Sequence, residues 1–535
     1  MTKTLREQKL KSLHGVVRTC GLFCARITVM FMAWIALAAH VGTEQVVLEG
    51  MAGGYPVRVV IRPPGIVPAQ VPIIVRVLHG SPTRVTVRAT QFSVGLKGAP
   101  PAEAASVVPG EIGTYAHDLW IMTSGSYAIY VGVEGAAGNG TLLVPMVSAA
   151  THTLGMPKAI GGVLIVLGSL LAIGVFTLVG AATREATLPI GYTPDGARRK
   201  SARVAVGVST AVVALMLLGG AKWWQSAESD YRRGLYKPLE VTTSVRMQDS
   251  DRLLKLVVTD PQWQRGRTTP ITPDHGKLMH LFLIRANDAG VIAHLHPLRS
   301  ELTTFETLLP AIPAGKYFLF ADVLHESGFQ RTLVDTVDVP VAPAIVENDN
   351  GSAASAKGMA QPKTFSAFAD SDDAWRVVAP VAVGTASSFD GGSLTLSVDG
   401  QISVDRDVTL QVAVRNSDGI AAPLEPYMGM GGHMMVMRED GGVFVHLHPG
   451  GTASMTAQDV LARRERGDTG TSFSDAIKNE ASMRMLATSG ELAQTKSGTL
   501  TFPFAFPTKG KYRVFVQVKK NGVVQTASFA LTVPK

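Results

Sequence analysis

The sequence His280-Leu-Phe-Leu-Ile-Arg285, followed by Gly290-Val-Ile-Ala-His294-Leu-His296-Pro297, returns later in the chain as His433-Met-Met-Val-Met-Arg438, followed by Gly442-Val-Phe-Val-His446-Leu-His448-Pro449. The match continues, because Gly315-Lys316-Tyr317 in the first copy corresponds to Gly510-Lys511-Tyr512 in the second. Such self-similarity indicates one structural unit used twice. Short runs of β-branched and aromatic residues, separated by turn residues, predict that each unit is a β-sandwich.

Strand geometry is expected to bring the histidines of each copy together. Side chains two residues apart in a strand point to the same face, about 6.5–7 Å apart. His294 and His296 therefore face one way, and His280 begins a strand that a hairpin at 287–290 joins to theirs. Neighbouring strands lie about 4.8 Å apart, so three imidazoles can converge on one ion. The second copy predicts the same arrangement for His433, His446 and His448.

The two copies differ in the residues around this motif. In the first, the flanking residues are Asp274, His275, Met279, Asp322 and His325; in the second, Gln517 and Lys520 replace Asp322 and His325, and the flanking residues are Met428, Met430, Met434, Met435 and Met437. Thioethers beside imidazoles favour copper, above all Cu(I), whereas imidazoles with a carboxylate suit Cu(II) or zinc. We therefore predict His325 as a further ligand of the first site, and Met430 and Met435 as further ligands of the second. The expected ion is copper, with zinc as the alternative.

Histidines in strands also occur without a metal, hydrogen-bonded to backbone carbonyls. The alternative to a metal-binding protein is therefore a non-metal envelope scaffold, or an assembly or adhesion module, with structural histidines. No phosphate-binding loop, nucleophile elbow or His-Glu-x-x-His motif occurs in the sequence, so we do not expect an enzyme.

Three phrases resemble a known kind of protein. They are Pro426-Tyr-Met-Gly-Met-Gly-Gly-His433, Phe444-Val-His-Leu-His-Pro449 and Gly510-Lys-Tyr-Arg-Val-Phe515. They look like bacterial exported β-sandwich proteins of the YtkA-like and FixH-like kind, and the resemblance covers both C-terminal units. The resemblance implies a β-sandwich fold and a role in copper handling or in the assembly of a respiratory oxidase.

Apolar residues are concentrated in three runs. The first, Ile27 to Ala39, follows a basic segment and ends near Ala-Leu-Ala, as in a cleaved signal peptide or a retained signal anchor. The runs at 159–182 and 204–221 carry no charge and are long enough to cross about 30 Å of hydrocarbon. Trp223 and Trp224 follow the last run, where an interfacial aromatic belt is expected.

Basic residues give these runs an orientation. The loop between the second and third runs contains Arg198, Arg199, Lys200 and Arg203, so the positive-inside rule places it in the cytoplasm. The basic N-terminus is then cytoplasmic as well. We expect a protein of the cell (inner) membrane with its large domains on the periplasmic or extracellular side.

The predicted fold class is mainly β, with three Ig-like or cupredoxin-like β-sandwich modules plus two to three transmembrane helices. The predicted segments are a cytoplasmic basic N-terminus (1–26), a signal anchor or signal peptide (27–43), an exported β-sandwich (44–157), a transmembrane helix (159–182), a cytoplasmic basic loop (183–203), a transmembrane helix (204–221), the first repeat (238–342), a linker (343–375), and the second repeat (376–535) with an insertion at 450–496. A short helix is expected at 456–464. The insertion is interpreted as a plain surface loop, a partner contact or a lid over the histidines.

The net charge of +8 lies largely beside the apolar runs. A nucleic-acid binder would gather such charge in a patch on a folded domain, so nucleic acid is not an expected partner. The expected partners are the lipid bilayer and another envelope protein or metallochaperone. Cys20 and Cys24 precede the first apolar run, and no other cysteine occurs, so exported domains would contain no disulfide.

Overall fold

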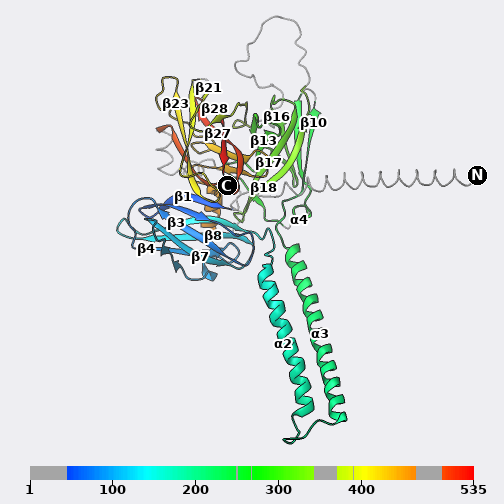
Figure 1. Cartoon of the computed structure of the whole chain (residues 1–535). Helices are drawn as coiled ribbons and strands as arrows, with labels where there is room; N and C mark the ends of the chain where they lie inside the picture. Colours follow the sequence, from blue (N-terminus) through cyan, green and yellow to red (C-terminus); the bar gives the residue numbers. More distant parts are fainter. Residues whose placement is uncertain are drawn as a thin grey trace, which may run out of the picture. The chain divides into compact units, whose positions relative to one another are not determined.

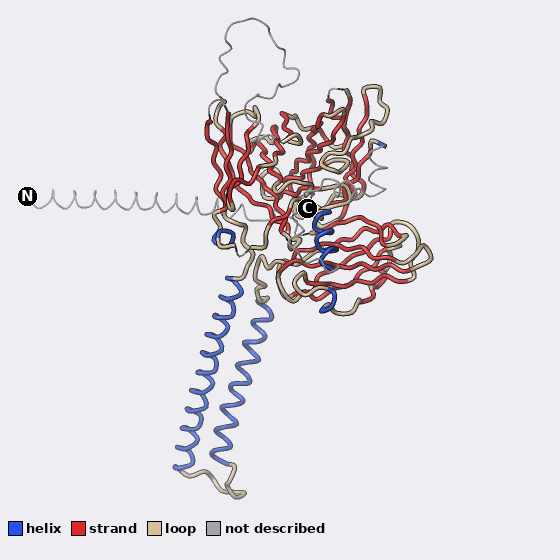
Figure 2. Tube along the Cα trace, turned by 180° about the vertical axis from the view of Figure 1, so that it is seen from behind, coloured by secondary structure: helices blue, strands red, loops and turns tan. Residues whose placement is uncertain are grey.

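Apolar and polar residues alternate along the strands of this protein. In β3 (Ala69–Val77), Val71 and Ile73 are buried, whereas Gln70 and Pro72 are exposed. This period of two places alternate side chains on opposite faces of a sheet. Patterns of this kind recur along the chain, and strands dominate the structure outside two long helices (Figure 2). The predicted mainly β class is confirmed.

The computed structural model describes residues 45–248, 251–266, 268–342, 370–389, 391–465 and 497–534. The predicted cytoplasmic N-terminus (1–26) and signal segment (27–43) lie outside the described residues. So do residues 343–369 of the predicted linker and 466–496 of the predicted insertion. The described residues form two compact units, one containing all the sheets and one containing two long helices.

The first β-sandwich has sheets in the orders β1-β2-β3-β7-β6 and β5-β4-β8-β9. One apolar core lies between them. Its elements besides β3 are β1 (Val46–Ala52), β2 (Tyr55–Ile61), β4 (Arg84–Gln91), the 3-10 helix η1 (Leu96–Gly98), β5 (Glu103–Ala104), β6 (Ser106–Val107), β7 (Thr114–Ile121), β8 (Gly125–Glu134) and β9 (Gly140–Ser148).

The first repeat has a four-stranded sheet, β10-β11-β16-β15, and a larger sheet, β12-β17-β13-β14-β19, in which β18 pairs with β17. Its elements are β10 (Val241–Gln248), β11 (Asp251–Val258), α4 (Pro261–Gln264), β12 (Ile271–Thr272), β13 (His280–Arg285), β14 (Val291–Leu295), β15 (Leu298–Glu301), β16 (Thr304–Leu309), β17 (Gly315–His325) and β18 (Gln330–Val339). The last strand of the larger sheet, β19 (Ala374–Val377), pairs with β14. The end of the predicted linker is therefore part of the first repeat's sheet.

The second repeat has sheets in the orders β21-β22-β23-β26 and β20-β28-β27-β24-β25. Its elements are β20 (Val381–Ala382), β21 (Ala386–Phe389), β22 (Gly392–Asp399), β23 (Asp407–Asn416), β24 (His433–Arg438), β25 (Phe444–Leu447), α5 (Met455–Glu465), β26 (Thr499–Ala505), β27 (Gly510–Lys520) and β28 (Val523–Val533). The helix α5 lies where the sequence predicts a short helix at 456–464.

The two repeats pack together through their larger sheets. Leu281 and Leu283 of β13 point into the core of the first repeat, whereas Phe282 points the other way. Phe282 belongs to an apolar layer shared with Phe444 of β25 and Phe320 of β17. The rings of Phe320 and Phe444 stack with centroids 4.1 Å apart. Four sheets therefore form consecutive layers (Figure 1). Strands β13 and β24 are buried on both faces.

Two helices form the second unit. They are α2 (Lys158–Glu185) and α3 (Gly196–Arg233), with mean hydropathy 2.6 and 2.2 in their most apolar windows. Both are long and apolar enough to cross a membrane, and each extends beyond the run predicted from the sequence. Asp195 begins α3 by accepting a hydrogen bond from the backbone N–H of Arg198, which is an N-cap.

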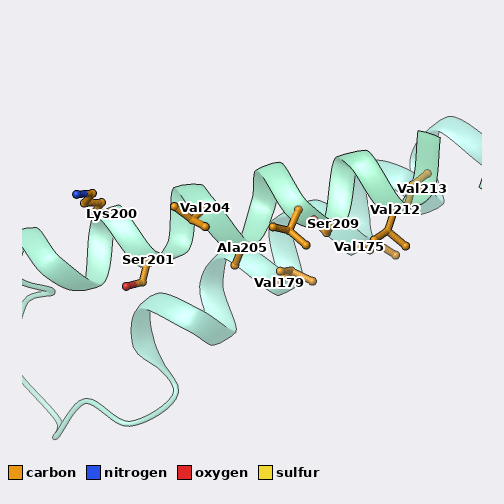
Figure 3. A pocket seen from close by; sticks show the side chains of 10 residues that line it. Val175, Val179, Lys200, Ser201, Val204, Ala205, Ser209, Val212 and Val213 are labelled. Carbon is orange, nitrogen blue, oxygen red and sulfur yellow. The ribbon is translucent and has the colours of Figure 1, made fainter. Parts of the chain in front are cut away.

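An apolar hollow of about 710 Å³ lies between α2 and α3. Figure 3 shows Val175 and Val179 of α2 near Val212 and Ala205 of α3, with Lys200 at one end. Valine side chains exposed in this way suit contact with lipid tails rather than with water.

A cluster of charged side chains connects the first sandwich to the second repeat. The Asp407 carboxylate accepts hydrogen bonds from Arg58 at 3.2 Å and from Arg76 at 2.5 Å. Arg58 also donates to Thr409 and pairs with Glu49. The Asp407 side chain is only 3% exposed, so solvent screens these pairs weakly.

Replacing Asp407 is expected to weaken this attachment. Asp407→Ala leaves two partly buried guanidinium groups without their shared carboxylate, so we expect unfolding to cost about 2–4 kcal/mol less. Thermal unfolding and limited proteolysis of the full chain measure the effect. The control is Glu134→Gln, which removes an exposed pair with Arg84 at 3.9 Å and should change little. Equal melting temperatures for the two variants would contradict this account.

Candidate metal centre

Strand periodicity places three histidines of the first repeat on one face of its larger sheet. His280 begins β13, and Phe282 of that strand stands opposite His294 of β14. His296 follows two residues after His294 and shares its face. This is the face that packs against the second repeat, because the neighbouring Ile292 belongs to the shared apolar layer.

The second repeat presents its histidines in the same way. His433 begins β24, and Met435 of that strand stands opposite His446 of β25. His448 follows on the same face. Met435 and Phe444 belong to the shared apolar layer, so this face points toward the first repeat.

The two sets of histidines meet at the interface between the repeats. Within the first set, the ring centroids of His280 and His294 lie 5.4 Å apart, and those of His280 and His296 lie 5.2 Å apart. Across the interface, the ring centroids of His280 and His446 lie 5.4 Å apart, as close as those of His280 and His294. His294 lies 5.8 Å from His446. We call these six side chains, three from each repeat, the histidine cluster: His280, His294, His296, His433, His446 and His448.

Burial keeps the histidine cluster uncharged. None of its six residues is more than 4% exposed. Burial lowers the pKa of His280 to about 4, and it lowers the pKa of the other five well below the usual 6.5. Neutral imidazoles, each with one nitrogen lone pair, are the form of histidine that binds metal ions.

In the first set, one nitrogen of each ring points away from the other histidines, and we call it the outer nitrogen. The contacts of the outer nitrogens determine which nitrogen of each ring carries the hydrogen. The Nε2 of His280 is 3.1 Å from the carbonyl oxygen of Asp274, which can only accept, so this nitrogen carries the hydrogen. The Nδ1 of His294 lies 2.9 Å from the side-chain oxygen of Gln517, and the Nδ1 of His296 lies 2.9 Å from the Asp373 carboxylate. With these assignments, the lone pairs are on His280 Nδ1, His294 Nε2 and His296 Nε2.

The second set has a corresponding outer side. The Nε2 of His433 donates to the carbonyl oxygen of Tyr427 at 3.2 Å. The Nδ1 of His446 lies 3.6 Å from the carboxylate of Asp322. Burial raises the pKa of Asp322 to about 7, and Thr332 donates a hydrogen bond to its other oxygen.

The inward nitrogens are close enough to share an ion. His280 Nδ1 and His294 Nε2 are 3.2 Å apart, and His433 Nδ1 and His446 Nε2 are 3.0 Å apart. Nitrogens bound to one tetrahedral ion at about 2.0–2.1 Å lie roughly 3.3 Å from each other. In each set of three, the candidate ligand atoms all lie within 4.8 Å of one another. The structure therefore shows two groups of histidines that can each hold a metal ion.

Each repeat supplies a side chain that contacts the outer nitrogen of a histidine in the other repeat. Gln517 of the second repeat contacts His294 of the first, and Asp322 of the first repeat contacts His446 of the second. Asp322 and Gln517 hold the same place in their strands, since Asp322 pairs with His280 and Gln517 pairs with His433. Such outer partners orient metal-binding histidines. Each set is thus completed by the other repeat.

His325, the further ligand predicted for the first set, makes contacts of its own. The Nδ1 of His325 donates to the carbonyl oxygen of Thr269 at 2.6 Å, and its ring lies edge-on to Trp263. Among the described residues, His325 belongs to none of the groups of converging ligands. Met435 lies in the shared apolar layer, and Met430 exchanges backbone hydrogen bonds with Tyr427 in the turn before His433.

Three important side chains were not among the predicted ligands. The ring centroid of His275 lies 4.8 Å from that of His448, and its Nε2 lies 3.5 Å from the Asp274 carboxylate. Asp373, near the end of the predicted linker, binds His296. Asp274 and His275 adjoin the repeated motif in the sequence, whereas Asp373 carries no signal that would connect it to the histidines.

The first sandwich supports the turn after His448. The backbone N–H of Thr452 donates to the carbonyl oxygen of Val47 in β1, and the N–H of Val47 donates to the Thr452 hydroxyl. A Cβ at Gly451 would lie 1.9 Å from that same carbonyl, so only glycine fits here. Ser454, two residues on, donates to the Asp274 carboxylate at 2.9 Å. The described start of the insertion therefore reaches the edge of the histidine cluster.

Comparison with known families gives one match. Residues 239–340 and 387–535 match the model of a domain of unknown function, DUF8832. The matched segments coincide with the two repeats, which contain the histidine cluster. No curated protein matches the chain.

Solved structures show only distant similarity. A mutant of Salmonella alpha-2-macroglobulin is 9% identical, with 92% of this chain and 24% of that chain covered and a TM-score of 0.18. Escherichia coli alpha-2-macroglobulin activated by porcine elastase is 8% identical, with 88% and 30% covered and a TM-score of 0.16. A putative membrane anchored protein from Corynebacterium diphtheriae is 10% identical, with 92% and 95% covered and a TM-score of 0.14. The chain spans less than a third of the two macroglobulin structures, and these scores support no inference about its function.

The metal-free protein is expected to lose stability as the pH falls from about 6.5 toward 4. An unfolded chain protonates its histidines near pH 6.5, whereas the buried imidazoles resist protonation, so acid favours the unfolded state. Asp322 and Asp373, whose pKa values rise to about 7, act in the opposite direction, but they are fewer than the histidines. Melting temperatures measured in EDTA across this pH range test this expectation. A melting temperature that stays constant or rises as the pH falls would contradict it.

Proposed function

We propose that this protein binds a pair of copper ions between its two repeats, one ion at each set of three histidines. The observation that carries the proposal is the convergence of inward lone pairs. In the first set, all three outer nitrogens face oxygen acceptors, so the bare nitrogens of His280 and His294 point at each other at 3.2 Å. Two facing lone pairs repel one another unless a cation lies between them.

The choice of copper rests on the ligand types. Buried neutral imidazoles suit copper and zinc, whereas Mg²⁺ and Ca²⁺ require oxygen ligands. A methionine lies beside the second set, because Met435 of β24 stands opposite His446 of β25. Thioethers near imidazoles favour copper over zinc.

Burial of the histidine cluster supports a protein that holds its metal rather than one that passes it on at the surface. A chaperone that exchanges copper by collision needs ligands that a partner can reach. Here the imidazoles lie between two sheets and beneath the segment around Ser454. We propose that metal enters during folding or from a metallochaperone or other envelope protein. The helices α2 and α3 would anchor the protein in the inner membrane, with the sheets on the periplasmic or extracellular side.

A scaffold with structural histidines is the second candidate, and one observation favours it. The pKa of Asp322 is raised to about 7 by burial, so its protonated form could donate to His446. His446 could then donate in turn to His433 without a metal. In the first set, His294 could donate to His280 in this way only if the Gln517 side-chain amide were flipped, so that its NH2 group donated to the Nδ1 of His294.

Elemental analysis of the full chain, purified in detergent without an affinity tag, distinguishes the two candidates. We expect two copper ions per chain. His294→Ala with His296→Ala, and separately His446→Ala with His448→Ala, should each remove one ion. A matched control is His117→Ala in the first sandwich, where the histidine pairs with Glu103, and it should retain both ions.

The scaffold predicts a different result for the same proteins. The paired substitutions would lower the melting temperature, but copper would not raise the melting temperature of the wild type. Wild-type protein that takes up no copper or zinc, and is not stabilised by either, would overturn the proposed function.

A further inference from the structure

The turns that precede the two sets of histidines have the same conformation but different side chains. In the first repeat, Asp274 and Lys277 exchange backbone hydrogen bonds, both of 2.9 Å. In the second repeat, Tyr427 and Met430 exchange the same pair, of 2.7 and 3.1 Å. The carbonyl oxygens of Asp274 and Tyr427 then accept from the first histidine of each set.

The residue after Asp274 or Tyr427 adopts a left-handed conformation in both turns. His275 and Met428 each have φ of 51°, and the following glycines, Gly276 and Gly429, each have φ of 81°. Residues other than glycine are uncommon at such positions; histidine is among the more frequent of them, and methionine is not. The shared backbone conformation makes His275 and Met428 equivalent positions of the two repeats, with different side chains beside buried histidines.

The His275 ring reaches across the interface to the other repeat's histidines. Its centroid lies 4.8 Å from that of His448 and 5.9 Å from that of His433, but 6.2 Å from that of His280 in its own repeat. Its side chain is therefore closest to the second set, although it belongs to the first repeat.

The nitrogens at this contact form no hydrogen bond among the described residues, although the Nε2 of His275 lies 3.5 Å from the Asp274 carboxylate. The Nε2 of His275 and both ring nitrogens of His448 are buried and make no hydrogen bond. Their candidate ligand atoms and a carboxylate oxygen of Asp274 lie within 4.8 Å of one another. Buried polar atoms are almost always satisfied, and nitrogens that converge in this way beside a carboxylate suit a cation as their partner.

We infer that His275 is the fourth ligand of the ion at the second set, so that both repeats hold this ion. The inference rests on the proposed function. The ligands are then His433, His446, His448 and His275, with the Asp274 carboxylate beside them. Four nitrogen ligands suit Cu(II) and Zn(II). The equivalent turn position in the second repeat offers the thioether of Met428, so the two metal positions are chemically unequal.

The test exchanges His275 for the residue that the protein itself uses at the equivalent turn position. His275→Met keeps a side chain that this backbone conformation accommodates in Met428, and the metal-free melting temperature verifies folding. The full chain in detergent is titrated with Zn(II) in competition with a chromophoric chelator. We expect two zinc ions to bind the wild type, and we expect the variant to hold one of them at least about 100-fold more weakly.

Co(II) provides an independent readout, because its visible absorption reports coordination number. Loss of a ligand by His275→Met should change the spectrum of one of two bound Co(II) ions. The matched control is Met428→Leu, which changes the equivalent turn in the other repeat and should leave the four-histidine position unaltered.

Two further results separate this inference from the proposed function. If the wild type binds two ions, His446→Ala with His448→Ala removes one, and His275→Met changes neither affinity nor spectrum, the inference is wrong and the proposed function stands. If the wild type binds no ion, both are overturned.

Discussion

Six buried imidazoles facing one another between two sheets set the main constraint on this protein. Burial disfavours their protonated forms, and contacts to backbone and side-chain oxygens direct the remaining hydrogens of His280, His294 and His433 outward. The inward lone pairs then repel one another unless a cation neutralises them. Contacts from the neighbouring repeat, such as that of Gln517 with His294, become intelligible as supports that orient ligands.

The cluster exists because β13 and β24 are buried on both faces. One face of each strand packs in the core of its own sandwich, and the other carries histidine at the end and apolar residues beyond it. The stacked rings of Phe320 and Phe444 lie in the apolar layer beside the histidines. That layer excludes water from one side of the cluster, which strengthens every electrostatic interaction within it. The first sandwich contributes from a distance by holding the turn that follows His448.

The sequence was sufficient to predict each set of three histidines, because strand period and a short hairpin are local properties. It was insufficient to predict that the sets face each other, since sheet packing depends on residues far apart in the chain. A signal was present: Leu281 to Ile284 and Met434 to Met437 are apolar without interruption, as in strands buried on both faces. His325 resembled a ligand by its place in the repeat, but β17 ends beside Trp263 and away from the cluster. Asp373 could not be found, because its approach to His296 depends on the pairing of β19 with β14.

The central claim is that the two sets of histidines form one centre that holds two ions. Anomalous X-ray diffraction at the copper edge, from crystals of the copper-loaded full chain, tests it most directly. The account predicts two anomalous peaks within the histidine cluster, one about 2.0–2.1 Å from the inward nitrogens of each set. It is contradicted if the cluster contains no peak and the paired imidazoles hydrogen-bond directly to each other, or if copper lies only elsewhere on the protein.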